Sequence, residues 1–142
     1  MTAVTDTMMT LKKILIVEDT EVHRDLMQYE LKDRYDLEFA TDSQTALRLL
    51  RENRYDLVII DFNLPPGPNE RAQSGEGQRI LQAIRDRQSD QKLPMKIVVV
   101  SSYLGDQDTI EAKEAGVDRI FDKPFSLYEF TDSIDRLWDD RE

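Results

Sequence analysis

The chain has 142 residues and no cysteine, and its 29 acidic residues outnumber its 19 basic residues, giving a formal net charge of -10. The length corresponds to one domain. The negative charge argues against a broad basic surface that would bind nucleic acid or anionic lipid. The lack of cysteine excludes disulfides, thiolate zinc sites and thiol nucleophiles. No apolar run approaches the ~20 residues that span a bilayer, and the first ten residues lack signal-peptide features, so we expect a soluble, cytoplasmic protein without membrane insertion.

Short apolar runs alternate with helical patterns along most of the chain. Residues 1–10 show no apolar period and are predicted to be a flexible tail, with one domain over residues 11–142. The runs are Ile14–Val17, Leu37–Ala40, Leu57–Ile60, Ile97–Val100 and a shorter one around Ile120 and Phe121. Uninterrupted runs rich in Ile and Val are typical of parallel strands that are buried on both faces.

Apolar residues at helical spacing follow each run. Those that carry the period are Val22, Leu26, Met27 and Leu31; Ala46, Leu47, Leu49 and Leu50; Ile80, Leu81 and Ile84; Ile110, Ala112 and Ala115; and Leu127, Phe130, Ile134 and Leu137. Thr41 with Gln44 and Ser126 with Glu129 have the spacing of helix-capping pairs. Five strands and five helices in alternation predict an α/β fold with a parallel sheet covered on both faces, and a mixed α+β domain is the less favoured alternative.

One segment interrupts this alternation. Residues Pro65 to Gly77 contain three of the five prolines and three of the five glycines, which predicts a loop longer than the usual connection of about 2–6 residues. The loop is interpreted either as a mobile surface insertion or as an element that contacts a partner or covers the neighbouring site.

Polar residues follow the ends of four strands. They are Glu18 and Asp19 after the first strand, Asp61 and Asn63 after the third, Ser101 after the fourth, and Lys123 after the fifth. Parallel strands end at one edge of the sheet, which is where open α/β sheets bind ligands. Three carboxylates, a hydroxyl and an ammonium group are therefore expected to converge there.

This combination of groups suits phosphoryl transfer. Clustered carboxylates resist ionisation, and a divalent cation such as Mg²⁺, which prefers oxygen ligands, relieves that repulsion. Aspartate can act as a nucleophile and form an aspartyl-phosphate. The transferred group then needs positive charge around its oxygens, which a metal ion and Lys123 would supply.

Five segments, in this order and spacing, resemble the receiver domain of two-component response regulators, from about Leu11 to Trp138. They are Ile14–Asp19, Tyr55–Pro65, Val98–Ser102, Ala115–Asp118 and Asp122–Phe125. The sequence is most similar in kind to single receivers of the chemotaxis-regulator type. The resemblance implies a flavodoxin-like, doubly wound, five-stranded parallel sheet in the strand order 2-1-3-4-5 with five helices.

The resemblance also implies roles for individual residues. Asp61 would be the phosphoacceptor, Ser101 the switch hydroxyl, and Lys123 the cation that pairs first with Asp61 and then with the phosphate. A Mg²⁺ or Mn²⁺ ion would be held by Glu18, Asp19, Asp61 and the backbone carbonyl of Asn63. Asn63 and Tyr103 would flank the path of the attacking water, and the Lys123-Pro124 bond would be cis.

The implied function is that of a phosphorylation-controlled signalling receiver. A histidine kinase or phosphotransfer protein would phosphorylate Asp61, the output would be contact with an unidentified downstream protein rather than direct nucleic-acid binding, and the chain would catalyse only its own phosphorylation and dephosphorylation. The alternative is a receiver-like binding scaffold that does not use phosphorylation. An aspartate-nucleophile phosphatase is disfavoured because Asn63 stands where such an enzyme needs an acid.

Two residues depart from or add to this pattern. Ile120 occupies the position three residues before Lys123 where the family often has an aromatic switch residue, so the output face is expected to signal differently. His23, the only histidine, falls on the first predicted helix and is expected to face solvent.

Overall fold

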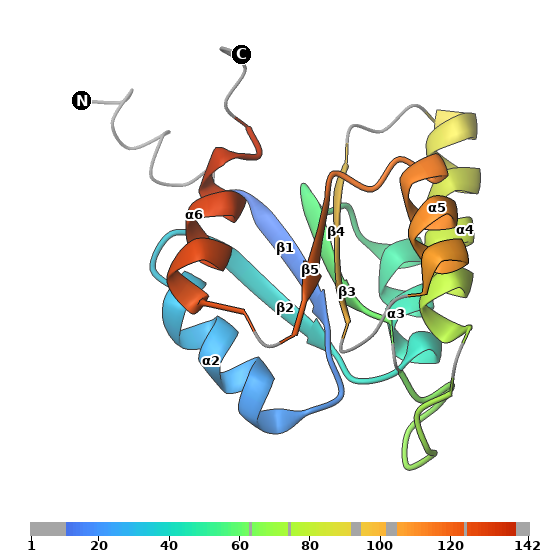
Figure 1. Ribbon diagram of the computed structural model, residues 1–142, viewed down its shortest axis with the longest axis horizontal. Coiled ribbons are helices and arrows are strands. Elements are labelled where there is room, and N and C mark those ends of the chain that lie inside the picture. The colour runs from blue at the N-terminus through green and yellow to red at the C-terminus, as the bar shows by residue number, and fades with distance from the viewer. Residues whose placement is uncertain are drawn as a thin grey trace.

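The computed structural model describes residues 11–62, 64–73, 75–91, 95–101, 105–123 and 125–138. Strands and helices alternate through these residues as predicted (Figure 1). The elements are β1 (Lys13–Val17), α2 (Glu21–Leu31), β2 (Asp36–Ala40), α3 (Ser43–Glu52), β3 (Leu57–Asp61), α4 (Glu76–Gln91), β4 (Lys96–Ser101), α5 (Asp106–Glu114), β5 (Arg119–Asp122) and α6 (Leu127–Arg136).

The strands form one parallel sheet in the order β2-β1-β3-β4-β5, which confirms the predicted topology. Ile16 of β1 lies opposite Phe39 of β2 on one side and Ile59 of β3 on the other. The chain therefore moves outward from β1 to β2 and then crosses back to β3. This reversal places the switch point of the sheet between β1 and β3.

Helices cover both faces of the sheet, with α2 and α6 on one face and α3, α4 and α5 on the other (Figure 1). Successive side chains of a strand point to opposite faces, so each strand contributes to two cores. Leu15 and Val17 of β1 pack in the core under α3, α4 and α5, whereas Ile14 and Ile16 pack in the core under α2 and α6. Burial on both faces explains why the strands read as continuous apolar runs.

Helix α2 differs from its predicted burial. Met27 and Leu31 are buried, but Val22 and Leu26, which belong to the same apolar period, are 63% and 43% exposed. Helix α3 begins one residue later than the capping pair predicted, because Asp42 rather than Thr41 is the N-cap and its carboxylate accepts a hydrogen bond from the backbone N–H of Thr45. Within the described residues, no helix has the length and apolar character needed to cross a membrane.

Candidate functional site

The ends of four strands bring the predicted site residues to one edge of the sheet. Asp61 is the last residue of β3 and Ser101 the last of β4, while Glu18 follows β1 and Lys123 follows β5. Glu18, Asp61 and Ser101 are buried. Oxygen atoms from Glu18, Asp19 and Asp61 all lie within 4.8 Å of one another, so the three carboxylates form a single acidic cluster across the switch point.

Lys123, which follows β5, also contacts this cluster. Its Nζ donates hydrogen bonds to Asp61 Oδ2 at 3.0 Å and to Glu18 Oε1 at 3.3 Å. The Lys123 side chain is only 15% exposed, and its backbone N–H donates to the carbonyl of Ser101 at 2.8 Å. The pairing between β4 and β5 thus aims the ammonium group at the two buried carboxylates.

The electrostatics of the site are dominated by burial and by the like charges. Burial, and then the repulsion of the Asp61 carboxylate, raises the pKa of Glu18 to about 7. Burial acts to lower the pKa of Lys123, but attraction to Asp61 and Glu18 outweighs it and raises that pKa above its ordinary value. One ammonium group is therefore surrounded by more negative charge than it neutralises, which favours an additional cation.

The donor set fits a divalent metal ion. Glu18, Asp19 and Asp61 offer only hard carboxylate oxygens at mutual distances that one ion can bridge. Two of the three side chains are buried, and the single positive charge of Lys123 balances only one of them.

His23 is partly exposed, as expected, but it also contacts this site, which was not expected. Its Nδ1 lies 3.2 Å from Lys123 Nζ and 3.6 Å from Glu18 Oε2, although the side chain is still 40% exposed. The helix α2 begins at Glu21, so its first turn remains close to the acidic pair. Two residues of the same turn donate hydrogen bonds to Glu18. The backbone N–H of Thr20 donates to Glu18 Oε2, and the guanidinium group of Arg24 donates to the backbone carbonyl of Glu18.

The loop after β3 is attached to the N-terminus of α3. The backbone N–H groups of Ser43 and Gln44, which have no partner within their own helix, donate to the carbonyls of Pro65 and Pro66 at 3.0 Å. The Ser43 hydroxyl also donates to a carboxylate oxygen of Glu76, at the start of α4. The loop thus links the beginnings of two helices on the same side of the sheet.

Other predicted features fall on the periphery of the cluster. Ile120 is partly buried and packs against the core under α3, α4 and α5, while Phe121 packs toward Phe125 and Phe130 on the other face. Asn63, Tyr103 and Pro124, together with the predicted tail at residues 1–10, lie outside the described residues.

The chain resembles known proteins over most of its length. The family profile described as "Response regulator receiver domain" matches residues 14–135. The chemotaxis protein CheY-3 of Vibrio cholerae is 28% identical over 129 residues, which cover 89% of this chain and 92% of that protein. Among solved structures, the non-phosphorylated HemR receiver domain of Leptospira biflexa is 28% identical, with a TM-score of 0.72, and the alignment covers 88% of this chain and 92% of that chain. CheY4 of Vibrio cholerae is 26% identical, with a TM-score of 0.72, and the alignment covers 89% and 98% of the two chains.

These matches agree with the strand order and with the acidic edge of the sheet. Members of the matched family are signalling domains that receive a phosphoryl group from a histidine kinase or phosphotransfer protein, rather than conventional enzymes. The chain belongs to the response regulator receiver domain family and is a phosphoacceptor domain of two-component signalling.

Proposed function

We propose that Asp61 is the residue that accepts the phosphoryl group, in a Mg²⁺-dependent reaction. The observation that carries this proposal is the position of Lys123 Nζ, 3.0 Å from Asp61 Oδ2 and 3.3 Å from Glu18 Oε1. Lys123 contacts one oxygen of the Asp61 carboxylate, and the same carboxylate belongs to the acidic cluster with Glu18 and Asp19. A nucleophile placed between an ammonium group and a metal-binding cluster is arranged for phosphoryl transfer.

The transfer exchanges one bond to phosphorus for another. A carboxylate oxygen of Asp61 forms the new O–P bond while the bond between phosphorus and the donor breaks, and the donor leaves with that electron pair. Lys123 stabilises the charge on the phosphoryl oxygens, and Ser101 is the hydroxyl that donates to one of them. Bound Mg²⁺, held by Glu18, Asp19, Asp61 and the carbonyl of Asn63, would supply further positive charge to these oxygens.

The phosphoryl group is removed again by hydrolysis, in which water is the only other reactant. Attack of a water oxygen on phosphorus releases inorganic phosphate and restores the Asp61 carboxylate, with Lys123 again stabilising the phosphoryl oxygens. We propose that the chain catalyses only these two reactions of its own carboxylate and transmits the difference between the two states through protein contacts.

Labelling with acetyl phosphate and Mg²⁺ tests this assignment. Intact-mass spectrometry is expected to show a gain of one phosphoryl group that depends on Mg²⁺ and is absent in Asp61→Asn. Asp122→Asn is the matched control, because Asp122 is an exposed carboxylate at the end of β5, one strand beyond the neighbouring β4 at the same edge of the sheet, and it should label normally. Labelling of Asp61→Asn would move the phosphoacceptor elsewhere, and no labelling by any donor would favour the scaffold alternative.

We also propose that the protein phosphodonor docks on the outer face of α2. Val22, Leu26 and Tyr29 are spaced by four and three residues, so they share one face of the helix, and they are 63%, 43% and 73% exposed. This apolar stripe begins one residue before His23, which touches Lys123. A partner that covers the stripe therefore sits beside the phosphoacceptor edge.

A further inference from the structure

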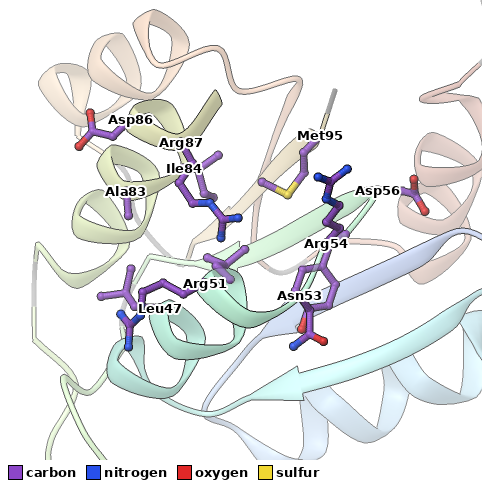
Figure 2. Close-up of a pocket in the computed structure, with 12 residues that line it drawn as sticks. Leu47, Arg51, Asn53, Arg54, Asp56, Ala83, Ile84, Asp86, Arg87 and Met95 are labelled. Atoms are coloured by element: carbon purple, nitrogen blue, oxygen red, sulfur yellow. The ribbon is translucent and has the colours of Figure 1, made fainter. Parts of the chain in front are cut away.

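The structure contains a cavity that the phosphoacceptor site does not use. It lies between α3 and α4, beside the beginnings of β3 and β4, with a volume of about 620 Å³ (Figure 2). Its apolar wall is formed by Leu47, Leu50, Ala83, Ile84 and Met95. The five-residue strand β3 separates it from Asp61, so it opens about 16 Å from the phosphoacceptor.

Three arginines border these apolar walls. Arg51 comes from the last turn of α3, Arg54 from the connection to β3, and Arg87 from α4. Within the part of the chain that the structure describes, none of the three forms an ion pair, whereas Arg48 and Arg79 on the same helices pair with Glu52 and Glu76. Among the described residues, the cavity therefore has three cationic groups that form no ion pair.

The two carboxylates at the cavity accept hydrogen bonds from other groups. Asp56 accepts a hydrogen bond from the backbone N–H of Lys13 at 2.8 Å, and Asp86 accepts one from Gln82 at 2.9 Å. Figure 2 shows both carboxylates at the outer sides of the view, while the Arg87 side chain reaches into the space between the helices. The lining thus carries three guanidinium groups and two carboxylates, a formal excess of one positive charge, although the whole chain carries a net charge of -10.

We propose that this cavity binds a small amphipathic anion, with an apolar body against the leucine, isoleucine and methionine side chains and a carboxylate or phosphate on the arginines. Its volume lies within the range of about 300–1,000 Å³ that is typical of small-molecule sites. Guanidinium groups bind carboxylate and phosphate in a bidentate manner and stay protonated at all physiological pH values. An apolar wall with a cationic rim selects against neutral and cationic molecules of the same shape.

Titration of the full chain with decanoate, followed by calorimetry, tests the charge requirement. Decanoate is expected to bind saturably at one site, whereas decylamine and 1-decanol are expected not to bind. The double variant Arg54→Gln/Arg87→Gln should weaken decanoate binding at least tenfold, because the carboxylate of decanoate loses two charged hydrogen-bond donors. Arg85→Gln is the matched control, since Arg85 is exposed on α4 outside the cavity, and it should bind decanoate like the parent chain.

A steric variant tests the location independently of charge. Ala83→Phe fills the space between the helices and should abolish decanoate binding, while Gln82→Phe, at an exposed neighbouring position, should not. Circular dichroism and thermal denaturation establish that each variant is folded before it is titrated. The proposal is overturned if decanoate does not bind, if it binds equally well to the filled or arginine-depleted variants, or if decylamine binds as tightly. Binding of an acidic peptide without decanoate binding would also overturn it, in favour of a protein-docking groove.

Discussion

Lys123 shows how a single residue can be shared between two functions of the site. Its ammonium group pairs with Glu18 and Asp61, the carboxylates that a metal ion would also require. Burial, and then the repulsion of the Asp61 carboxylate, raises the pKa of Glu18 to about 7 even though Lys123 acts to lower it. Lys123 and a divalent ion would therefore both stabilise the phosphoryl oxygens, but they would compete for the carboxylates of Glu18 and Asp61.

The variant Lys123→Met separates these two effects. Removal of the competing cation is expected to raise Mn²⁺ affinity by about threefold to tenfold, or about 0.7–1.4 kcal/mol, as measured by calorimetric titration. The rate of labelling by acetyl phosphate should fall by roughly tenfold to a hundredfold, because the phosphoryl oxygens lose a charged hydrogen-bond donor. Lys113→Met, on an exposed part of α5, should change neither quantity. Unchanged or weaker Mn²⁺ binding in Lys123→Met would contradict the competition.

The contact of His23 with the site could not be predicted from residue patterns. The acidic pair, Asp61 and Lys123 could be predicted because each follows an apolar strand, and parallel strands end at one edge. The contact between His23 and Lys123 joins residues 100 positions apart in the chain. It depends on the direction in which α2 leaves β1, and no local pattern encodes that direction.

Among the elements, α4 depends on an unusually close approach at its beginning. A Cβ atom on Gly77 would lie 2.4 Å from Cδ1 of Phe62 and 2.9 Å from its Cα. Phe62 is buried next to Asp61 and its backbone N–H donates to the carbonyl of Val100. The ring and backbone of Phe62 therefore cannot easily move away from a Cβ atom at position 77. The glycine allows the helix to start directly over the end of β3.

Gly77→Ala is expected to destabilise the protein, although the same change in an exposed helix usually stabilises it by about 0.5–1 kcal/mol. The clash with Phe62 should lower the free energy of unfolding by roughly 1–3 kcal/mol, measured by chemical denaturation. Arg85→Ala, at an exposed position of the same helix, should change it by less than about 0.5 kcal/mol. An equal or greater stability of Gly77→Ala would show that the beginning of α4 can move away from β3.

The α2 helix shows why an apolar period does not reveal which face will be covered. Its periodic residues predicted a helix correctly, yet the sheet and α6 cover only the side that carries Met27 and Leu31. Val22, Leu26 and Tyr29 remain exposed on the other side. From the sequence alone, such residues cannot be distinguished from core residues, because both obey the same spacing.

Val22→Glu is expected to reduce phosphotransfer from a protein donor by at least about tenfold, since it places a charge in an apolar contact. Labelling by acetyl phosphate, which needs no docking surface, should be unchanged. The comparison uses a phosphorylated histidine phosphotransfer protein and measures the initial rate of transfer with each donor. Ile110→Glu is the control, because Ile110 is an exposed apolar residue on α5, over the opposite face of the sheet. Equal losses in the two variants, or a loss with acetyl phosphate as well, would count against docking on α2.

At the scale of the whole molecule, each of the two cores contains a tyrosine that resists ionisation. Burial, reinforced by a hydrogen bond to Glu38, raises the pKa of Tyr55 well above its ordinary value of 10.0. Burial and the bond to Asp135 raise the pKa of Tyr35 in the same way. Both phenols are thus kept neutral in the folded chain at pH values where they ionise in the unfolded chain.

The free energy of unfolding is therefore expected to fall as the pH rises above about 10. A group whose pKa is raised by folding contributes its full stabilisation below its unfolded pKa, and this stabilisation is lost through the range up to its folded pKa. Each phenol adds at most about 1.4 kcal/mol per pH unit to the slope. Chemical denaturation of Tyr35→Phe/Tyr55→Phe between pH 8 and pH 11 should give a shallower decline than the parent chain. A decline of equal slope would mean that other groups control alkaline unfolding.

The fold as a whole was more predictable than the surfaces it creates. Runs such as Leu57–Ile60 predicted the strands because burial on both faces demands apolar residues throughout. The ends of the strands were less predictable. Asp36 and Lys96 belong to their strands because of backbone pairing, and their polar side chains do not indicate a strand. The cavity between α3 and α4 was not predictable, because it depends on how two helices splay rather than on which residues they contain.

The end of the described chain lies close to its beginning. The Lys12 ammonium group sits 5.1 Å from the centre of the Trp138 ring, and Tyr35 packs against the same indole. Because β1 starts at the edge of the sheet away from Asp61, this junction lies remote from the phosphoacceptor. A chain built in this way can be cut and rejoined, or inserted into a host protein, with its entry and exit at one place. Joining residue 12 to residue 138 by a short linker, with new ends at the exposed tip around Asn69, would preserve both cores and leave the acidic edge untouched.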